Sequence, residues 1–370
     1  MLALACRACG RTYEAGASEP WRCECGMALD FAETPRPSGG PDIDATDGLW
    51  AFADLLPTDA AVTLGEGFTP LAVADGWDAQ FKLDYVFPSG SYKDRGATVM
   101  LSRAAELGVE RVVEDSSGNA GAAVAQYAAR AGIDAEIYVP ASAKSSKLRA
   151  IERAGATAVR ISGSRADVTE ACVAAVESGD AWYASHAWNP AFYEGTATFA
   201  YELAAQCDWD VPDAIVLPLG HGTLFLGAYR GFRRLREIGW TDEMPRLLGV
   251  QAAGVAPVAT AVSDGATGEC GAQGERPDGD DVNTVADGIQ ISQPARMAQL
   301  VDAIDDCDGD AIAVGEEATD AALDRLHRAG FYCEPTSAAA VAGLAAYRER
   351  GTLAATDDVV VPLTGSGLKA

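Results

Sequence analysis

Hydrophobic and polar positions follow two alternating periods along most of the chain. Apolar residues recur at helical spacing over 92–107, 120–131, 145–154, 165–178, 223–237, 316–329 and 335–349. Between these segments lie short runs rich in valine, isoleucine and leucine, which predict strands at 110–114, 135–140, 156–162, 214–219, 247–252 and 358–363. Strands that alternate with helices form βαβ units, so the pattern predicts an α/β fold in which parallel sheets are flanked by helices.

Two segments show neither period. Residues 30–48 are rich in proline, glycine and aspartate and predict a linker. Residues 264–283 are acidic and rich in glycine, and they predict an exposed acidic loop. We find no internal repeat in the sequence, so a solenoid or propeller architecture is not expected.

Four of the nine cysteines lie close to the N-terminus, at Cys6, Cys9, Cys23 and Cys25. A glycine follows each of the two pairs and allows the tight turn that directs backbone N–H groups toward sulfur. Four thiolates can bind one Zn²⁺ tetrahedrally, so we predict a structural zinc ribbon, although C-x-C replaces the usual C-x2-C in the second pair. A degenerate ribbon with four reduced thiols remains the alternative. The other cysteines are scattered, which does not indicate a disulfide framework.

The net charge of the chain argues against some classes of binding partner. The chain carries 54 acidic and 28 basic residues, a formal net charge of −26, which argues against binding to nucleic acid or to an anionic membrane surface. We see no apolar stretch of transmembrane length and no signal-peptide pattern, so we expect a cytoplasmic protein. Only five of the basic residues are lysines. Acid excess with so few lysines predicts a halophilic protein, because concentrated salt screens the self-repulsion.

Glycine- and serine-rich turns follow several predicted strands, at the sheet edge where ligands bind in α/β folds. The turn LPLGHGTLFLG at 217–227 opens a helix, and its unpaired N–H groups suit a phosphate. The turn EDSSGNAG at 114–121 offers two hydroxyls and an amide, which suit a carboxylate. Each turn alone is also typical of purely structural connections between strand and helix.

Lys93 lies in the turn PSGSYKDRG at 88–96, at the start of a predicted helix. The helix dipole disfavours a cation there, so this is a poor position for a structural lysine. It is a suitable position for an amine that attacks a carbonyl. The alternative is an ordinary solvated lysine, which carries less weight in a chain with only five lysines.

These turns appear in a characteristic order with TLGEGFTPL at 63–71, EPTSAAAVAGL at 334–344 and PLTGSGLK at 362–369. The ordered set resembles the threonine synthase and threonine dehydratase group of fold-type II pyridoxal phosphate (PLP) enzymes from about residue 60 to the C-terminus. GEGFTPL, TGSGLK and the N-terminal ribbon are most similar to threonine synthases. The resemblance implies a two-lobed fold-type II PLP enzyme with a small N-terminal zinc ribbon. We therefore expect a ribbon at 1–30, a linker at 31–48 and a PLP-dependent catalytic core at 49–370, with a small lobe of about 96–190.

The resemblance also implies roles by position. Lys93 matches the lysine that binds PLP covalently, Asn119 the asparagine bonded to the PLP 3′-oxygen, and Thr364 the hydroxyl residue that faces the pyridine nitrogen. The residues that match the phosphate cup are Gly220, His221, Gly222, Thr223 and Leu224. Those that we expect to bind the substrate are Ser116 and Ser117, at its carboxylate, and Lys147, which aligns with a lysine of threonine synthases.

Several motifs depart from the family pattern. PSGSYKD stands in place of PTGSFKD, DSSGNA in place of STGNA, and GHGTL in place of GNxGN, which leaves PLP binding intact but puts the substrate in doubt. The roles of His186 and His221 stay open. A hydroxyl at the ring nitrogen makes PLP a weaker electron sink, which favours elimination or replacement at the β or γ carbon.

The resemblance therefore implies a PLP-dependent lyase that acts on a small amino-acid substrate. The first expectation is a threonine synthase, which converts O-phosphohomoserine and water to threonine and phosphate. A Ser/Thr dehydratase, a cysteate synthase-like enzyme and a diaminopropionate ammonia-lyase-like enzyme are the alternatives, and a homodimer stays open. A non-catalytic PLP-fold protein and a zinc-ribbon nucleic-acid-binding protein are further alternatives, disfavoured by Lys93 and by the acidic charge respectively.

Overall fold

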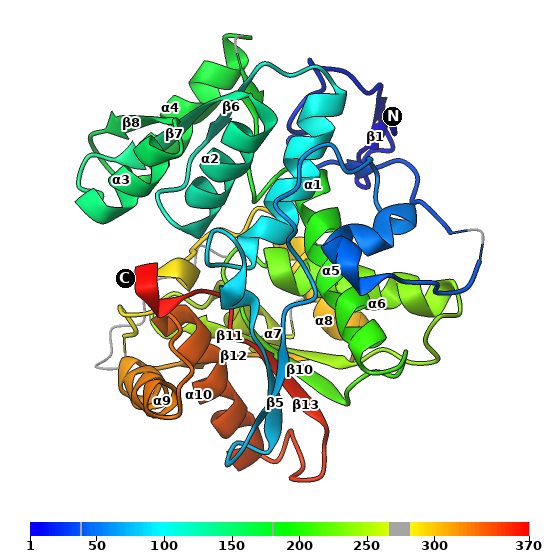
Figure 1. Cartoon of the computed structure of the whole chain (residues 1–370). Helices are drawn as coiled ribbons and strands as arrows, with labels where there is room; N and C mark the ends of the chain where they lie inside the picture. Colours follow the sequence, from blue (N-terminus) through cyan, green and yellow to red (C-terminus); the bar gives the residue numbers. More distant parts are fainter. Residues whose placement is uncertain (38, 180, 266–281, 370) are drawn as a thin grey trace. The chain divides into compact units, whose positions relative to one another are not determined.

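The computed structural model describes the chain except residues 38, 180, 266–281 and 370 (Figure 1). It divides into two compact units: Met1–Phe68 with Lys93–Thr198, and Thr69–Tyr92 with Phe199–Ala370. Most of the predicted acidic loop at 264–283, with Cys270, lies outside the described residues. None of the described helices is both long and apolar enough to cross a membrane.

A four-stranded parallel sheet organises the first unit, in the order β8-β7-β6-β9. The sequence predicted three of its strands to within about a residue at each end. The fourth, β9, is only two residues long and gave no periodic signal. Their bounds are Arg111–Glu114 for β6, Asp134–Pro140 for β7, Thr157–Ile161 for β8 and Trp182–Tyr183 for β9.

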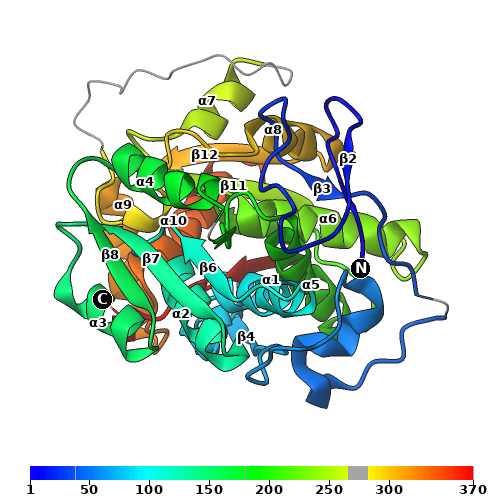
Figure 2. The same cartoon turned by 90° about the horizontal axis from the view of Figure 1, so that it is seen from above.

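Helices cover both faces of this sheet. Figure 2 shows α4 (Arg165–Glu177) on one face and α2 (Asn119–Ala131) with α3 (Ser145–Arg153) on the other. The alternation of the strands explains this arrangement: Val112 belongs to the hydrophobic core with α2, whereas its neighbour Val113 packs in a separate core with α4. The helix α1 (Lys93–Glu106) is buried along most of its length and packs beside α2.

The N-terminal segment belongs to the first unit and forms a small antiparallel sheet in the order β2-β1-β3. Its strands are β1 (Leu4–Ala5), β2 (Thr12–Tyr13) and β3 (Asp30–Phe31). A buried cation ties this ribbon to α1, because Nε of Arg103 donates to Glu19 Oε1 at 3.1 Å. The described residues between β3 and the 3-10 segment η1 (Ala45–Leu55) have no regular secondary structure.

The second unit contains a six-stranded sheet in the order β12-β11-β10-β13-β5-β4. All neighbours are parallel except β4, which is antiparallel to β5. The predicted strands at 214–219, 247–252 and 358–363 are confirmed, while β4, β5 and β12 were not predicted. The bounds are Leu71–Ala74 for β4, Ala79–Lys82 for β5, Ala214–Pro218 for β10, Arg246–Ala252 for β11, Asp310–Val314 for β12 and Val359–Pro362 for β13.

The helices of the second unit include three predicted ones, α6, α9 and α10, each confirmed to within one residue. In Figure 1, α9 and α10 lie side by side, and both contribute to a core with the sheet. The chain reaches this unit through α5, which was not predicted because its apolar residues surround the whole helix. The bounds are Pro190–Gln206 for α5, Thr223–Glu237 for α6, Pro257–Ser263 for α7, Met297–Asp306 for α8, Glu316–Arg328 for α9 and Pro335–Glu349 for α10.

Candidate active site

The turn between β6 and α2 contains the predicted carboxylate-binding residues of the first unit. Asp115 fixes the start of this turn, because it accepts hydrogen bonds from Thr169 Oγ1 at 2.5 Å and from the Tyr183 hydroxyl at 2.9 Å. Ser116 is buried, and its Oγ accepts a hydrogen bond from the backbone N–H of Gly118 at 3.2 Å. Close packing also restricts the turn, since a Cβ on Gly121 would lie 1.8 Å from the Ser116 carbonyl oxygen.

The end of this turn is the N-terminus of α2. Asn119 is the first residue of the helix, and both Asn119 and Ser117 are half-buried. The N-cap residue Gly118 provides no side-chain cap for the first turn. The segment therefore presents hydroxyl groups, an amide and helical N–H groups in a fixed turn, which is a donor set that suits a carboxylate.

Lys93 begins α1 and is half-buried. Its Nζ lies 5.8 Å from the centroid of the Phe192 ring. The Phe192 ring packs directly against α1 at Gly96. A Cβ added to Gly96 would lie only 2.4 Å from atoms of this ring. The amine of Lys93 thus lies beside an aromatic wall within the first unit.

A buried acid–histidine pair lies at the same edge of the sheet. Glu114 is the last residue of β6, and its Oε1 is 2.6 Å from Nδ1 of His186, which follows β9. Burial raises the pKa of Glu114 well above its usual value, and the negative charge of Asp115 adds to the rise. The sequence offered one weak signal for this pair, an acidic residue at the end of an apolar strand.

The predicted phosphate turn lies in the second unit, between β10 and α6. Gly222 adopts a left-handed conformation with φ 76°, and its added Cβ would lie 2.4 Å from Leu300. A Cβ on Gly220 would lie 3.2 Å from the carbonyl oxygen of Gly288. Thr223 and Leu224 are buried, and the N-cap residue Gly222 has no side chain with which to cap the first turn of α6. The backbone can therefore approach a phosphate closely and offer it helical N–H groups, so these residues fit the phosphate of PLP.

Thr364 lies just beyond the end of β13, the strand next to β10. It is buried, and its backbone N–H donates to Ser337 Oγ at 2.9 Å. The same oxygen lies 3.2 Å from Thr364 Oγ1. Ser337, the third residue of α10, thus holds the Thr364 hydroxyl in place.

Tyr92 joins the phosphate turn to Thr364 within the second unit. Its hydroxyl lies 2.8 Å from Thr223 Oγ1, and its backbone N–H donates to the Thr364 carbonyl at 3.0 Å. Tyr92 immediately precedes Lys93 in the sequence. Sequence reasoning noted Tyr92 only as a departure from the family motif, and it did not predict this connection.

The remaining candidates are the predicted substrate lysine Lys147, its neighbour Lys144, and two of the three histidines. Lys147 is the third residue of α3 and is half-buried, whereas Lys144 is the exposed N-cap of the same helix. His221 lies between the two glycines of the phosphate turn and is half-buried. His327 is half-buried in α9, where its Nε2 lies 2.9 Å from the Cys333 carbonyl oxygen.

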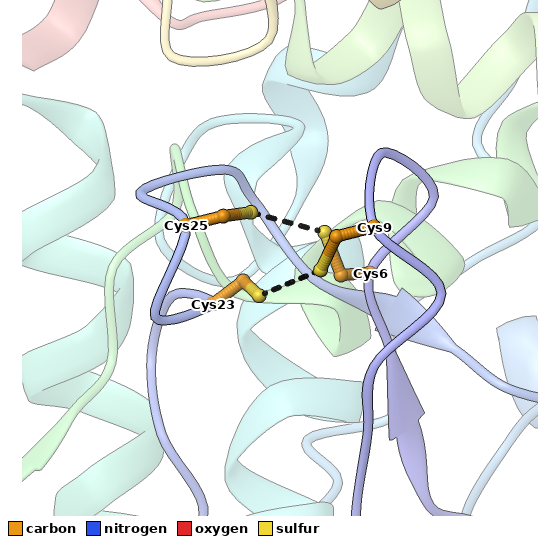
Figure 3. A group of neighbouring side chains, drawn as sticks. All are labelled: Cys6, Cys9, Cys23 and Cys25. Carbon is orange, nitrogen blue, oxygen red and sulfur yellow. Dashed lines mark hydrogen bonds between the residues drawn. The ribbon is translucent and has the colours of Figure 1, made fainter.

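The N-terminal cysteines come together as predicted (Figure 3). The four sulfur atoms lie within 4.8 Å of one another, with 3.6 Å between Cys6 and Cys25 and 3.5 Å between Cys9 and Cys23. The Tyr13 hydroxyl donates to Cys23 Sγ at 3.2 Å and lowers the pKa of that thiol to about 6. Zinc–sulfur bonds of about 2.3 Å in a tetrahedron place sulfur atoms about 3.8 Å apart, so this cluster suits one zinc ion.

Comparison with known proteins gives a consistent picture. A family model described as "Pyridoxal-phosphate dependent enzyme" matches residues 62–365. Threonine synthase of Methanosarcina acetivorans is 36% identical over 334 residues, which are 87% of this chain and 80% of that protein. Threonine synthase of Methanocaldococcus jannaschii is 30% identical over 381 residues, which are 98% of this chain and 92% of that protein.

Solved structures share the fold at lower identity. Processed threonine deaminase isoform 2 of Solanum lycopersicum superposes with a TM-score of 0.70 at 22% identity, and the match covers 90% of this chain and 87% of that chain. Maize serine racemase gives a TM-score of 0.66 at 22% identity, with 81% and 88% covered. The predicted α/β architecture is thus the one found in these enzymes.

Proposed function

This chain belongs to the pyridoxal-phosphate dependent enzyme family, and from that premise we propose that it is an amino-acid lyase of the threonine synthase type. In this proposal it takes O-phosphohomoserine and water to threonine and phosphate. The similarity to threonine synthases over nearly the whole chain supports this substrate. The structural observation that supports the proposal most strongly concerns Tyr92, which precedes Lys93 in the sequence. Tyr92 contacts both Thr223 and Thr364.

The residues that would hold PLP follow from the family resemblance and lie in several segments of the chain. The amine of Lys93 would attach it, and the phosphate would bind at Gly220, His221, Gly222, Thr223 and Leu224. Asn119 would hydrogen-bond its 3′-oxygen and Thr364 would face its ring nitrogen. When bound, the cofactor supplies an electron sink that makes the α-proton of an amino acid removable.

The chain's own groups would then bind the substrate and move protons. Ser116 and Ser117, with the N–H groups that open α2, would bind the substrate carboxylate and orient the α-carbon. Lys93 would take the proton from that carbon as a general base. Thr364 offers a neutral hydroxyl, fixed by Ser337, where an aspartate would hold a proton on the ring nitrogen.

A discriminating assay would compare substrates on one preparation of the holoenzyme. We expect release of inorganic phosphate and formation of threonine from O-phosphohomoserine to exceed keto-acid formation from threonine or serine. Keto-acid formation alone would favour a dehydratase. Borohydride reduction followed by peptide mass spectrometry should place a pyridoxyl group on Lys93. Labelling of one of the other four lysines instead would overturn the assignment of the site.

We also infer that the four N-terminal cysteines bind a structural zinc ion. A four-thiolate site leaves no open coordination position, so the metal would stabilise the ribbon without taking part in catalysis. Two conformational details support this role: Gly10 and Gly26, which follow the cysteine pairs, adopt left-handed φ values of 75° and 86°.

We further infer from the composition of the chain that the protein is adapted to concentrated salt. The chain combines a net charge of −26 with only five lysines. Of these, Lys82 is fully buried beside Glu202, so even fewer lysines offset the acidic surface. Such a surface repels itself unless mobile ions screen it, which supports a halophilic protein.

A further inference from the structure

Asp115 directly follows β6, and its carboxylate is bonded to two other elements of the first unit. Its Oδ2 accepts a hydrogen bond from Oγ1 of Thr169 in α4 at 2.5 Å, and its Oδ1 accepts one from the hydroxyl of Tyr183 in β9 at 2.9 Å. Tyr183 and Val113, two residues before Asp115, belong to the core that packs with α4. The carboxylate of Asp115 is therefore directed to the α4 side of the sheet, whereas the chain continues into α2 on the other side (Figure 2).

Both donors of these hydrogen bonds are held in place. Tyr183 is buried, and its ring meets the ring of Trp21 edge-on with centroids 5.3 Å apart. Burial, followed by the negative charge of Asp115, raises the pKa of Tyr183 well above its usual value, so its hydroxyl keeps its hydrogen and donates. Thr169 is half-buried and follows Val168, which belongs to the same core. Hydrogen bonds to a carboxylate are stronger than those between neutral groups, so these two fix the orientation of Asp115.

The residues directly after Asp115 form the turn to which we assign the substrate carboxylate. Within this turn, Ser116 Oγ accepts a hydrogen bond from the Gly118 N–H at 3.2 Å, and the Ser116 carbonyl oxygen packs closely against Gly121. These contacts fix the turn internally, whereas the hydrogen bonds of Asp115 fix it to α4 and β9. A site whose groups are already in place loses less conformational freedom when a ligand binds, and it therefore binds that ligand more tightly.

The direction of the Asp115 carboxylate also affects the charge of the site. A negative charge repels an anionic ligand, and this repulsion decreases with distance. The two hydrogen bonds keep the charge of Asp115 on the α4 side of the sheet, whereas the N–H groups suited to an anion open α2. Loss of either bond would let the carboxylate rotate, which would weaken the binding of a carboxylate more than that of a neutral ligand.

We propose that Asp115 is a positioning residue for the substrate carboxylate: through Thr169 and Tyr183 it fixes the turn that opens α2 and keeps its own charge directed away from the bound anion. The proposal rests on the function proposed above, of which it needs only that the substrate is an amino acid. It assigns a role to the aspartate of DSSGNA, one of the departures from the family motif. Removing either hydroxyl should weaken substrate binding and leave the proton transfer by Lys93 unchanged.

The binding test uses L-alanine and L-alaninamide with the holoenzyme. L-alanine has no leaving group, so it reports binding without elimination, and L-alaninamide lacks the carboxylate charge. In calorimetric titrations, Tyr183→Phe and Thr169→Val should each raise the Kd of L-alanine by about fivefold and that of L-alaninamide by less than about twofold. Tyr138→Phe is the matched control, because Tyr138 packs in the same core and its hydroxyl donates to Glu136 at 3.4 Å. This control should bind both ligands like the wild type.

The outcomes separate this proposal from the proposed function. If Tyr183→Phe and Thr169→Val keep the wild-type ratio of the two Kd values, Asp115 is not a positioning residue, and the proposed function stands. Equal affinity of the wild type for both ligands would overturn this proposal together with the carboxylate-binding role of the turn. In turnover, KM should rise by about fivefold in the two variants while kcat stays within about twofold of the wild type. A fall of kcat without a rise of KM would show that these hydrogen bonds do not serve substrate binding.

Discussion

The hydroxyl of Tyr92 lies 2.8 Å from Oγ1 of Thr223, the first residue of α6. Through this contact the residue before Lys93 is tied to the turn that we assign to the cofactor phosphate. The backbone of Tyr92 is held as well, because its N–H donates to the Thr364 carbonyl at 3.0 Å. Tyr92, which precedes Lys93 in the sequence, is therefore bonded to two separate parts of the second unit.

Replacing Tyr92 with phenylalanine should weaken cofactor binding without preventing it. A neutral hydrogen bond contributes about 1 kcal/mol, so the affinity of the apoenzyme for PLP should fall by about fivefold. Absorbance titration of the apoenzyme with PLP measures this change. Tyr229→Phe is a matched control. Tyr229 lies further along α6, the helix that Thr223 begins, and its hydroxyl donates to Asp306 of α8 and not to the phosphate turn. Equal affinity in wild type and Tyr92→Phe would show that this contact does not organise the phosphate turn.

Thr364→Asp should change the balance of reactions. A carboxylate at this position would hold a proton on the cofactor's ring nitrogen and strengthen the electron sink. Racemisation and transamination should therefore rise several-fold relative to elimination, which chiral chromatography of the products can measure. Thr364→Ser keeps the hydroxyl and should resemble the wild type. The same product ratio in Thr364→Asp, with PLP still bound, would show that Thr364 does not face the ring nitrogen.

Amphipathic helices and the turns between them were predictable because their signals are local. The start of α6 at Thr223 and of α2 at Asn119 follows from a glycine turn and an apolar stripe a few residues long. The helix α5 gave no stripe, since it is apolar on all sides, and Lys82 gave no sign that it would be fully buried beside Glu202. A local pattern of apolar residues identifies the buried face of a single helix or strand. The burial of α5 on all sides and of Lys82 depends instead on which other elements pack against them.

The meeting of Glu114 and His186 could not be predicted for a related reason. It requires β9 to pair with β6, and β9 has only two residues, too few for a periodic pattern. The order of strands in a parallel sheet is set by long connections and by the packing of helices between them. Each candidate residue could therefore be recognised from the motif of its own turn. The residues that contact it could be identified only from the three-dimensional structure.

Loss of the proposed zinc ligands should lower the stability of the protein more than its catalytic rate. Trp21 of the ribbon packs edge-on against Trp188, with ring centroids 5.0 Å apart, so a disordered ribbon would expose this core. We expect Cys9→Ser with Cys23→Ser to lower the melting temperature by about 5 °C or more and to abolish bound zinc, while kcat at low temperature stays close to wild type. Cys207→Ser, outside the cluster, is the control. A loss of kcat in proportion to zinc in still-folded protein would contradict a purely structural role.

Dilution of salt should unfold the protein. We expect loss of the circular dichroism signal below about 0.5 M KCl, because unscreened carboxylates repel one another across the surface. Sucrose at equal osmolality should not restore the signal if charge screening is the cause. Full stability in dilute buffer would instead indicate an ordinary acidic surface.

Lys147 should help to select a phosphorylated substrate. It follows β7 at the start of α3, where its ammonium and the first helical N–H groups can bind an anion. A hydrogen bond to a charged group contributes about 1.5–3 kcal/mol, so Lys147→Ala should lower kcat/KM for O-phosphohomoserine by about tenfold or more. It should have little effect on any reaction of serine or threonine. Lys144→Ala removes the exposed lysine that caps the same helix and controls for net charge. Equal losses for both kinds of substrate, or none, would assign no role to Lys147 in choosing the leaving group and would favour the dehydratase alternative.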